Sequence, residues 1–276
     1  MTARIERVVV ALDAVSENRA TIDTAARLAA RWRARLHGVF VEDDDLLRLA
    51  NLPFARQVSV GAGVERLTLQ QAERQLRAFA EQARRDIAAA AHRLNVDWSF
   101  DVVRGGAAAG IAGASATDFL VAGTATRPIG GHFRVECRWW SAVAVAPATS
   151  TFLLSSRMWD RDGAVVALVP KREAATERLL DAAAQLAEAG GRQLAVVCPG
   201  ELAEDEAFVA WLGERLASYS VPVEIDLAPS EPTEMLRRIV DLDCRLLAVS
   251  ATSAHAKPDQ LRNLIAKAAC DVVVVR

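Results

Sequence analysis

The residues best suited to chemistry stand in the segment from Gly123 to Trp140, GTATRPIGGHFRVECRWW. The pair Gly130 and Gly131 gives it flexibility in the middle, and basic side chains surround the pair. These are Arg127, His132, Arg134 and Arg138. Arginine donates several N–H groups in a fixed fork that fits phosphate or carboxylate. The segment therefore predicts a loop able to hold an anion by side chains, with His132 able to titrate near neutral pH.

Other elements must place a pocket beside this loop. Asp13 ends a β-branched run, Val41 lies in the next run, and Gly105 and Gly123 end two more. In open α/β sheets ligands bind outside the carboxyl ends of the strands, where these four residues should meet. The glycine-rich stretch RGGAAAGIAG (104–113) predicts a short or irregular helix there, which widens the crevice.

The chain contains an internal repeat. Residues 8–45 and 164–201 each show a β-branched run, a helix-length amphipathic segment and a second β-branched run. They align without a gap at a constant offset of 156, so that Ala11 matches Ala167 and Val41 matches Val197. Each copy therefore begins with a βαβ unit.

Apolar periodicity predicts the helices. One face of the first helix carries Ile22, Ala25, Ala29, Trp32 and Leu36, and the matching helix of the second copy carries Leu179, Ala183, Leu186 and Ala187. A long helix follows in the first copy, with Leu69, Ala72, Leu76, Phe79, Ala83, Ile87, Ala90 and Leu94 on one face. Its shorter counterpart carries Phe208, Trp211, Leu212 and Leu216. Between the first βαβ unit and the long helix we expect a loop with a short helical turn.

Apolar strands alternating with helices predict an α/β fold with parallel strands and right-handed crossovers, five strands in each copy. The polar stretch SSRMWDRDG (155–163) marks the seam. The predicted domains are residues 1–156 and residues 163–276, the second being shortened.

Composition excludes several classes of function. The 33 basic and 35 acidic residues leave a net charge of −2, which favours neither nucleic acid nor an anionic membrane as partner. The four cysteines lie far apart without metal-site spacing, so no metal centre is expected and reduced thiols in a cytoplasm fit best. We see no signal peptide and no long uncharged apolar run, and we expect a soluble cytoplasmic protein.

The order of elements resembles the universal stress protein family. The resemblance rests on a first strand ending in Asp13, an Ala-rich first helix, and a last helix that runs through AAC (268–270) into a valine strand. It covers nearly the whole chain as two tandem copies. It implies two five-stranded parallel α/β sandwich domains, Rossmann-like and similar to adenine nucleotide alpha hydrolases. They would pair as an intramolecular pseudo-dimer through antiparallel last strands, TFLLS (151–155) and DVVVV (271–275).

The resemblance also implies an ATP motif, G-x-x-G-x9-G-[ST], after the fourth strand, and the second copy departs from it. Ser250 and Ser253 replace the first two glycines, and Pro258 and Asp259 fall on the Gly-Ser pair. Glycine allows backbone N–H groups to converge on phosphate, whereas proline has no N–H and aspartate repels an anion. Val169 also replaces the aspartate of the first strand. The second copy is therefore expected to be structural.

The first copy departs less from this motif. It keeps Asp13 and Gly123, but Thr126 replaces the second glycine, and Glu136 and Cys137 fall near the Gly-Ser pair. ATP or AMP in this copy remains a candidate ligand, and no cofactor is required. The candidate binding residues are Asp13, Val41, Gly105, Gly123, Thr124, Thr126, Arg127, Gly130, Gly131, His132, Arg134 and Cys137.

Weaker features have simpler interpretations. The run EDDD (42–45) offers carboxylates to a hard cation, but Asp45 fits a helix N-cap and the others a solvated strand end. Trp139 and Trp140 suggest a stacking surface, yet packing beside arginine stems is the more common role. Cys137 has no catalytic partner fixed by the sequence.

The leading hypothesis is a non-catalytic stress-response protein that senses an adenine nucleotide or another small anion through its first copy. The alternative is an interaction module that binds no nucleotide and grips a protein partner through the segment from Leu46 to Gly63 and the arginine-aromatic segment. A slow ATPase is the least favoured reading, because no general base or magnesium site is visible in the sequence.

Overall fold

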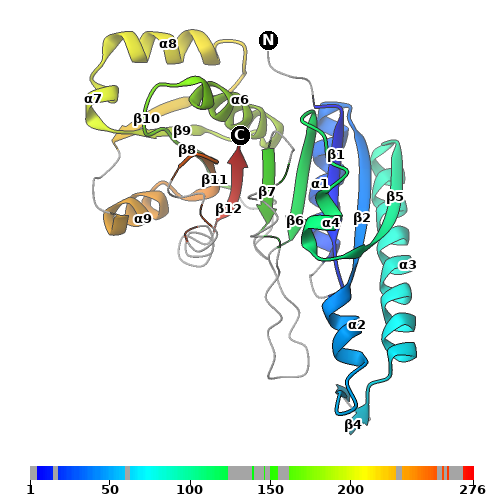
Figure 1. Cartoon of the computed structure of the whole chain (residues 1–276). Helices are drawn as coiled ribbons and strands as arrows, with labels where there is room; N and C mark the ends of the chain where they lie inside the picture. Colours follow the sequence, from blue (N-terminus) through cyan, green and yellow to red (C-terminus); the bar gives the residue numbers. More distant parts are fainter. Residues whose placement is uncertain are drawn as a thin grey trace. The chain divides into compact units, whose positions relative to one another are not determined.

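The structure is a computed structural model of the whole chain (Figure 1). It describes residues 5–14, 18–59, 63–123, 139, 146, 150–154, 162–227, 232–253, 257, 260 and 270–276. The chain divides into two compact units, formed by Ile5–Pro147 and Ala148–Arg276. We call them the first unit and the second unit.

A parallel sheet with the strand order β5-β2-β1-β6 forms the centre of the first unit. The strands are β1 (Arg7–Leu12), β2 (Arg35–Asp43), β5 (Trp98–Gly105) and β6 (Asp118–Gly123). β1 and β6 are buried almost throughout, which explains their unbroken apolar runs. β5 is more exposed, as an edge strand should be.

Helices cover this sheet on both faces. α1 (Asn18–Trp32) and α3 (Leu69–Leu94) pack against each other, and the short helix α4 (Ala107–Ile111) packs over β2 and β5. Right-handed crossovers place α1 and α3 on the same face, because both connections advance in one direction, and α4 on the other, because its connection runs back. Figure 1 shows α4 and α1 on opposite sides of β1.

The long helix α3 occupies the predicted segment. It begins with a capping box, in which Thr68 and Gln71 each bond the other's backbone N–H, and it ends at Asn95 in the left-handed conformation. Five predicted face residues are buried, namely Ala72, Leu76, Ala83, Ile87 and Ala90. The other three, Leu69, Phe79 and Leu94, are more than one third exposed, so the contact face is narrower than predicted.

Two local predictions for the first unit are wrong. α1 ends at Trp32 and Arg33 takes a positive φ of 52°, so Leu36 belongs to β2 and not to the helix face. The segment after β2 contains the expected helical turn, α2 (Asp44–Ala50), but also an unpredicted antiparallel hairpin. Its strands are β3 (Arg56–Ser59) and β4 (Gly63–Arg66).

The second unit repeats this topology with one more parallel strand. Its order is β10-β9-β8-β11-β12. The strands are β8 (Ala164–Leu168), β9 (Leu194–Cys198), β10 (Val223–Leu227), β11 (Cys244–Ser250) and β12 (Asp271–Val275). The helices are α6 (Ala174–Gly190), α7 (Gly200–Ala203), α8 (Glu206–Leu216) and α9 (Pro232–Asp241). The predicted buried face of α6 is confirmed. The shared strand order confirms the α/β repeat.

One strand precedes the predicted domain boundary in the sequence but belongs to the sheet of the second unit. β7 (Ser150–Leu154) lies antiparallel to β12, with Phe152 opposite Val273, so TFLLS and DVVVV are neighbours as the resemblance implied. The division between the compact units comes before this strand. The sheet of the first unit therefore has four parallel strands, and the predicted fifth strand of its copy extends the sheet of the second unit.

Candidate functional site

The carboxyl ends of the strands in the first unit gather the predicted pocket residues at one edge. Asp13 directly follows β1, and Gly123 ends β6. The register places Leu12 opposite Phe40 and Asp43 opposite Gly105. Asp13, Val41, Gly105 and Gly123 therefore lie at the same edge, which is the ligand edge of this class of sheet.

An indole ring is buried at this edge, in the space between Asp13 and α4 that we call the crevice of the first unit. Trp139 is only 2% exposed, and its Nε1 donates a hydrogen bond of 3.0 Å to Oδ2 of Asp13. The opposite side of the ring approaches α4, where a Cβ built on Gly110 would lie 3.0 Å from Cη2 of Trp139. The same Cβ would lie 2.5 Å from Cγ2 of Val41. The ring therefore reaches from the carboxylate of Asp13 to the wall formed by Val41 and Gly110.

The helix beside the ring is short because its sequence gives it little support. α4 has five residues, and Gly106 at its N-cap has no side chain to cap it. Gly105 precedes it with φ of +142°, a conformation that L side chains rarely adopt. The short helix predicted from the glycine-rich stretch is confirmed, and Gly110 leaves room for the indole.

A second polar side chain holds the backbone beside the carboxylate. Nδ2 of Asn18, the first residue of α1, donates to the main-chain oxygen of Asp13 at 2.8 Å. This bond fixes which end of the amide is the nitrogen. Oδ1 of Asn18 is buried and accepts no hydrogen bond in the structure. A buried acceptor without a donor is costly, so the site has an unused acceptor beside Asp13.

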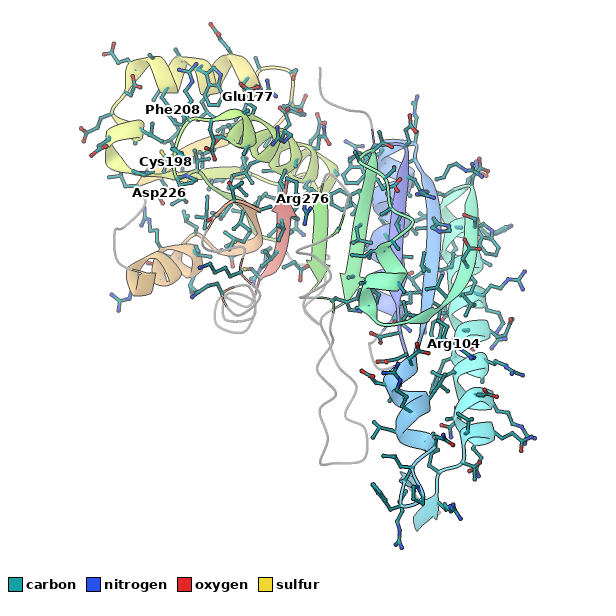
Figure 2. All side chains as sticks on the ribbon, viewed as in Figure 1. Arg104, Glu177, Cys198, Phe208, Asp226 and Arg276 are labelled. Carbon is teal, nitrogen blue, oxygen red and sulfur yellow. The ribbon has the colours of Figure 1, made fainter. Side chains whose placement is uncertain are left out.

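Charged side chains lie at the carboxyl ends of β2 and β5. Arg104, labelled in Figure 2, lies 3.0 Å from Glu42, and that contact raises the pKa of the guanidinium. Asp43 accepts the backbone N–H of Asp45 and is the N-cap of α2, so the prediction of Asp45 as N-cap is wrong by two positions. Among the described residues no cluster of three His, Cys, Asp or Glu side chains suits a metal ion.

The anion loop of the first copy lies outside the described residues. Its predicted members are Thr124, Thr126, Arg127, Gly130, Gly131, His132, Arg134 and Cys137. Pro258 and Asp259 of the second copy also lie outside them. These assignments stay predictions.

At the matching edge of the second unit, the first three backbone N–H groups after β11 are bonded within the protein. After β11, the N–H of Ala251 donates to the carbonyl of Val275 at 2.7 Å and that of Ser253 to the carbonyl of Ser250 at 2.9 Å. The N–H of Thr252 donates to Oγ of Ser250 at 3.3 Å. These three donors begin the loop that the family motif assigns to phosphate. Since each is already bonded within the protein, they do not converge on an empty anion site.

Side chains also tie this second edge together. Val169, at the position of Asp13, is 1% exposed, and its N–H bonds the carbonyl of Val197. Asp226 of β10 accepts two hydrogen bonds of 2.6 Å from Arg238 of α9, and these bonds lower the pKa of the carboxyl although its burial works in the opposite direction. Figure 2 labels Asp226 beside Cys198, which ends the neighbouring strand. Strand β10 is thus fastened to its following helix.

Solved structures of universal stress proteins have the same architecture, as the sequence resemblance implied. A universal stress protein from Archaeoglobus fulgidus matches with a TM-score of 0.63 at 11% identity, over 98% of this chain and 96% of that chain. The chain has the universal stress protein fold. A putative universal stress protein from Pseudomonas aeruginosa matches with a TM-score of 0.59 at 14% identity, over 99% and 94% of the two chains.

The same fold occurs in a different setting. The cytoplasmic domain of a prokaryotic cation chloride cotransporter matches with a TM-score of 0.51 at 12% identity, over 97% of this chain and 95% of that chain. No family model and no curated protein matches the sequence. In the part of this chain that the structure describes, no helix has the length and apolarity needed to span a bilayer.

Within this fold, the sequence did not reveal the bond between Trp139 and Asp13. The two residues are 126 positions apart, and packing was the favoured role for the tryptophan. The burial of Trp139 confirms that it packs inside the protein. Its neighbour there is the carboxylate of Asp13, which belongs to the candidate site. The glycines beside α4 were the one usable signal, since they indicated a wide crevice without showing what fills it.

Proposed function

We propose that this protein is a non-catalytic regulatory protein of the cytoplasmic stress response, and that a small ligand acts on it through the crevice of the first unit. The observation that carries the proposal is the seat between Asp13, Val41 and Gly110. It offers a carboxylate acceptor and apolar walls to a flat ring with an N–H donor. Adenine nucleotides have such a ring, and the arginines predicted at the loop would suit their phosphates.

Calorimetry with ATP and AMP at millimolar concentration tests this function. We expect one site per chain, and we expect Asp13→Ala to weaken it because the ring loses its acceptor. Ser250→Ala is the matched control, since that residue belongs to the closed edge of the second unit. Absence of heat and of any thermal shift, in wild type and in variants that open the crevice, would remove the nucleotide from the proposal.

We expect no turnover at this site. Oδ2 of the Asp13 carboxylate already accepts the indole N–H of Trp139. A phosphate-release assay checks this. Turnover that disappears in Asp13→Ala would contradict the non-catalytic assignment.

A second candidate function is an interaction module, favoured by exposed apolar side chains between Leu46 and Gly63. Leu49 of α2 is 53% exposed, and Phe54 in the following turn is 74% exposed. Leu52 between them is also exposed. A partner that binds wild type but not Phe54→Ser would support this function, with Val240→Ser, an equally polar change at an exposed position of the second unit, as control.

We further propose that the two copies associate as the subunits of a dimer would, using the pairing of β7 with β12. The support is the antiparallel register of Phe152 opposite Val273. Phe152→Pro would introduce into β7 a residue that a regular strand interior does not tolerate. Hydrogen exchange of β12 should then accelerate, and unchanged protection would count against this association.

A further inference from the structure

We propose that Trp139 is an internal occupant of the ligand seat, which an external planar heteroaromatic ring can take only after the indole has left. The identity of the physiological ligand rests on the proposed function above. The ligand seat, the space between Asp13, Val41 and Gly110, does not rest on the proposed function, because contacts within the chain define it.

The indole of Trp139 is held between Asp13 and Gly110 in the way that a bound aromatic ligand would be held. It is almost fully buried, and it uses its single N–H on Oδ2 of Asp13. The far side of the ring lies against Gly110, where an added Cβ would lie only 3.0 Å from Cη2 of the ring. A ring is therefore recognised by one polar contact at one end and by shape at the other, as small-molecule sites usually recognise their ligands.

The position of the ring argues against an ordinary core role. It occupies the carboxyl edge of a parallel sheet, where α/β folds bind ligands, and its partner is a carboxylate and not an apolar group. In the second unit the residue at the position of Asp13 is the buried Val169, which cannot accept a hydrogen bond through its side chain. The first unit alone has kept the acceptor, and a residue of the same chain uses it.

The indole also leaves one acceptor unused. Oδ1 of Asn18 is buried without a donor, on a residue that bonds the main chain of Asp13. Indole has no second N–H to offer. A fused heteroaromatic amine carries a second N–H group besides the one that would bond Asp13, and the neighbouring residue Asn18 has an acceptor without a donor. The favoured ligand class is therefore a bicyclic heteroaromatic amine, with adenine as the simplest probe.

Competition between the two rings has a measurable consequence. A ligand that binds only the vacated seat has its affinity reduced by the fraction of molecules in which the seat is vacant. Removing the indole should remove that reduction. We expect Trp139→Ala to bind adenine and AMP at least about tenfold more tightly than wild type does.

The first experiment uses indole itself as the probe. Trp139→Ala should gain thermal stability with rising indole concentration, whereas wild type should not. 1-Methylindole, which has no N–H, should bind about tenfold more weakly because it cannot donate a hydrogen bond to Oδ2 of Asp13. Trp211→Ala is the matched control, since that ring belongs to the second unit and contacts Phe208 and Arg172. Failure of indole to bind a cooperatively folded Trp139→Ala protein would overturn the proposal.

A second measurement keeps the test valid should Trp139→Ala fail to fold. In unmodified protein with ¹⁵N-labelled tryptophan, AMP should speed the solvent exchange of the Trp139 indole N–H and shift its resonance. Bound AMP that leaves this N–H protected would refute displacement.

The outcomes separate this proposal from the function on which it partly rests. If indole binds Trp139→Ala while adenine and AMP bind neither protein, the internal occupant stands and the nucleotide function fails. If AMP binds wild type and Trp139→Ala with equal affinity, the nucleotide function stands and the internal occupant fails.

Discussion

The two units share their strand order but close the same edge of the sheet by different means. In the first unit a side chain from far along the sequence, Trp139, bonds Asp13 and packs on Gly110. In the second unit the N–H groups of the three residues that follow β11, Ala251 to Ser253, are bonded within the protein, and Arg238 bonds Asp226 and so joins β10 to α9. In the second unit the hydrogen bonds come from main-chain donors, so breaking them would disrupt the local backbone structure. In the first unit the contacts depend on one indole ring, and moving that side chain would break them.

The difference shows how a duplicated fold can diverge at a binding edge while its core is kept. The strands of both units remain buried apolar runs, since any change there costs packing. At the carboxyl edge of the sheet the copies differ in charge, helix length and glycine content. The crevice of the first unit is therefore where a ligand response is to be sought.

The largest effect is expected from making the second unit resemble the first. Val169→Asp places a carboxylate at a position that is 1% exposed and packed for an apolar side chain. An uncompensated buried charge should lower the free energy of unfolding by about 3 to 5 kcal/mol. Chemical denaturation gives the value, and hydrogen exchange read by mass spectrometry assigns it to the second unit.

Val169→Thr is the control for this change, because it has nearly the same shape and no charge. We expect a smaller loss, about 1 to 3 kcal/mol, from burying one hydroxyl. Should Val169→Asp cost less than about 1 kcal/mol, the second edge would have to be hydrated, and the contrast between the units would be lost.

The next effect is expected at the wall of the first crevice. In Gly110→Ala the new methyl group would lie 2.5 Å from Cγ2 of Val41 and 3.0 Å from the Trp139 ring. Overpacking of this kind costs about 1 to 3 kcal/mol, and here it also pushes on the indole. Gly113→Ala, where nothing lies within 4 Å of the added carbon, should be nearly neutral. Equal stability of the two variants would mean that the indole does not rest on Gly110.

The sequence predicted the architecture because the architecture depends on local pattern. The repeat, the parallel strands and the short α4 all follow from apolar periodicity and glycine content in consecutive residues. The contents of the crevice depend on a contact between Asp13 and Trp139 that no local pattern encodes. The hairpin of β3 and β4 was missed for a related reason, since four-residue strands carry too little alternation to be read.

A smaller effect should follow from removing the carboxylate of the first crevice. Asp13→Ala leaves Nε1 of Trp139 buried without its acceptor, and we expect a loss of about 1 to 2 kcal/mol. Asp13→Asn keeps an oxygen acceptor and should lose less. The intrinsic fluorescence of the first unit should respond to Asp13→Ala more than to Asp13→Asn. An equal response to both would show that the indole is held by packing alone.

The smallest difference between the two units is expected in their stability at low pH, which should fall in both. In the first unit burial works to raise the pKa of Asp118, but hydrogen bonds from Arg7 and the Ser115 N–H outweigh it and the pKa is lowered. In the second unit Arg238 lowers the pKa of Asp226. A carboxyl whose pKa is lower in the folded state stabilises the fold above its unfolded pKa of about 3.9. That stability is lost as the pH falls through the folded-state pKa.

Wild type should therefore lose stability from about pH 5 downward, and Asp118→Asn and Asp226→Asn should each flatten part of this decline. Urea denaturation at pH 7 and at pH 3 measures it, with hydrogen exchange to assign each part to its unit. Because each unit has one such carboxylate in an ion pair with an arginine of the same unit, acid should destabilise both units. A decline confined to the first unit and abolished by Asp13→Asn would instead place the acid-sensitive group in the crevice beside Trp139.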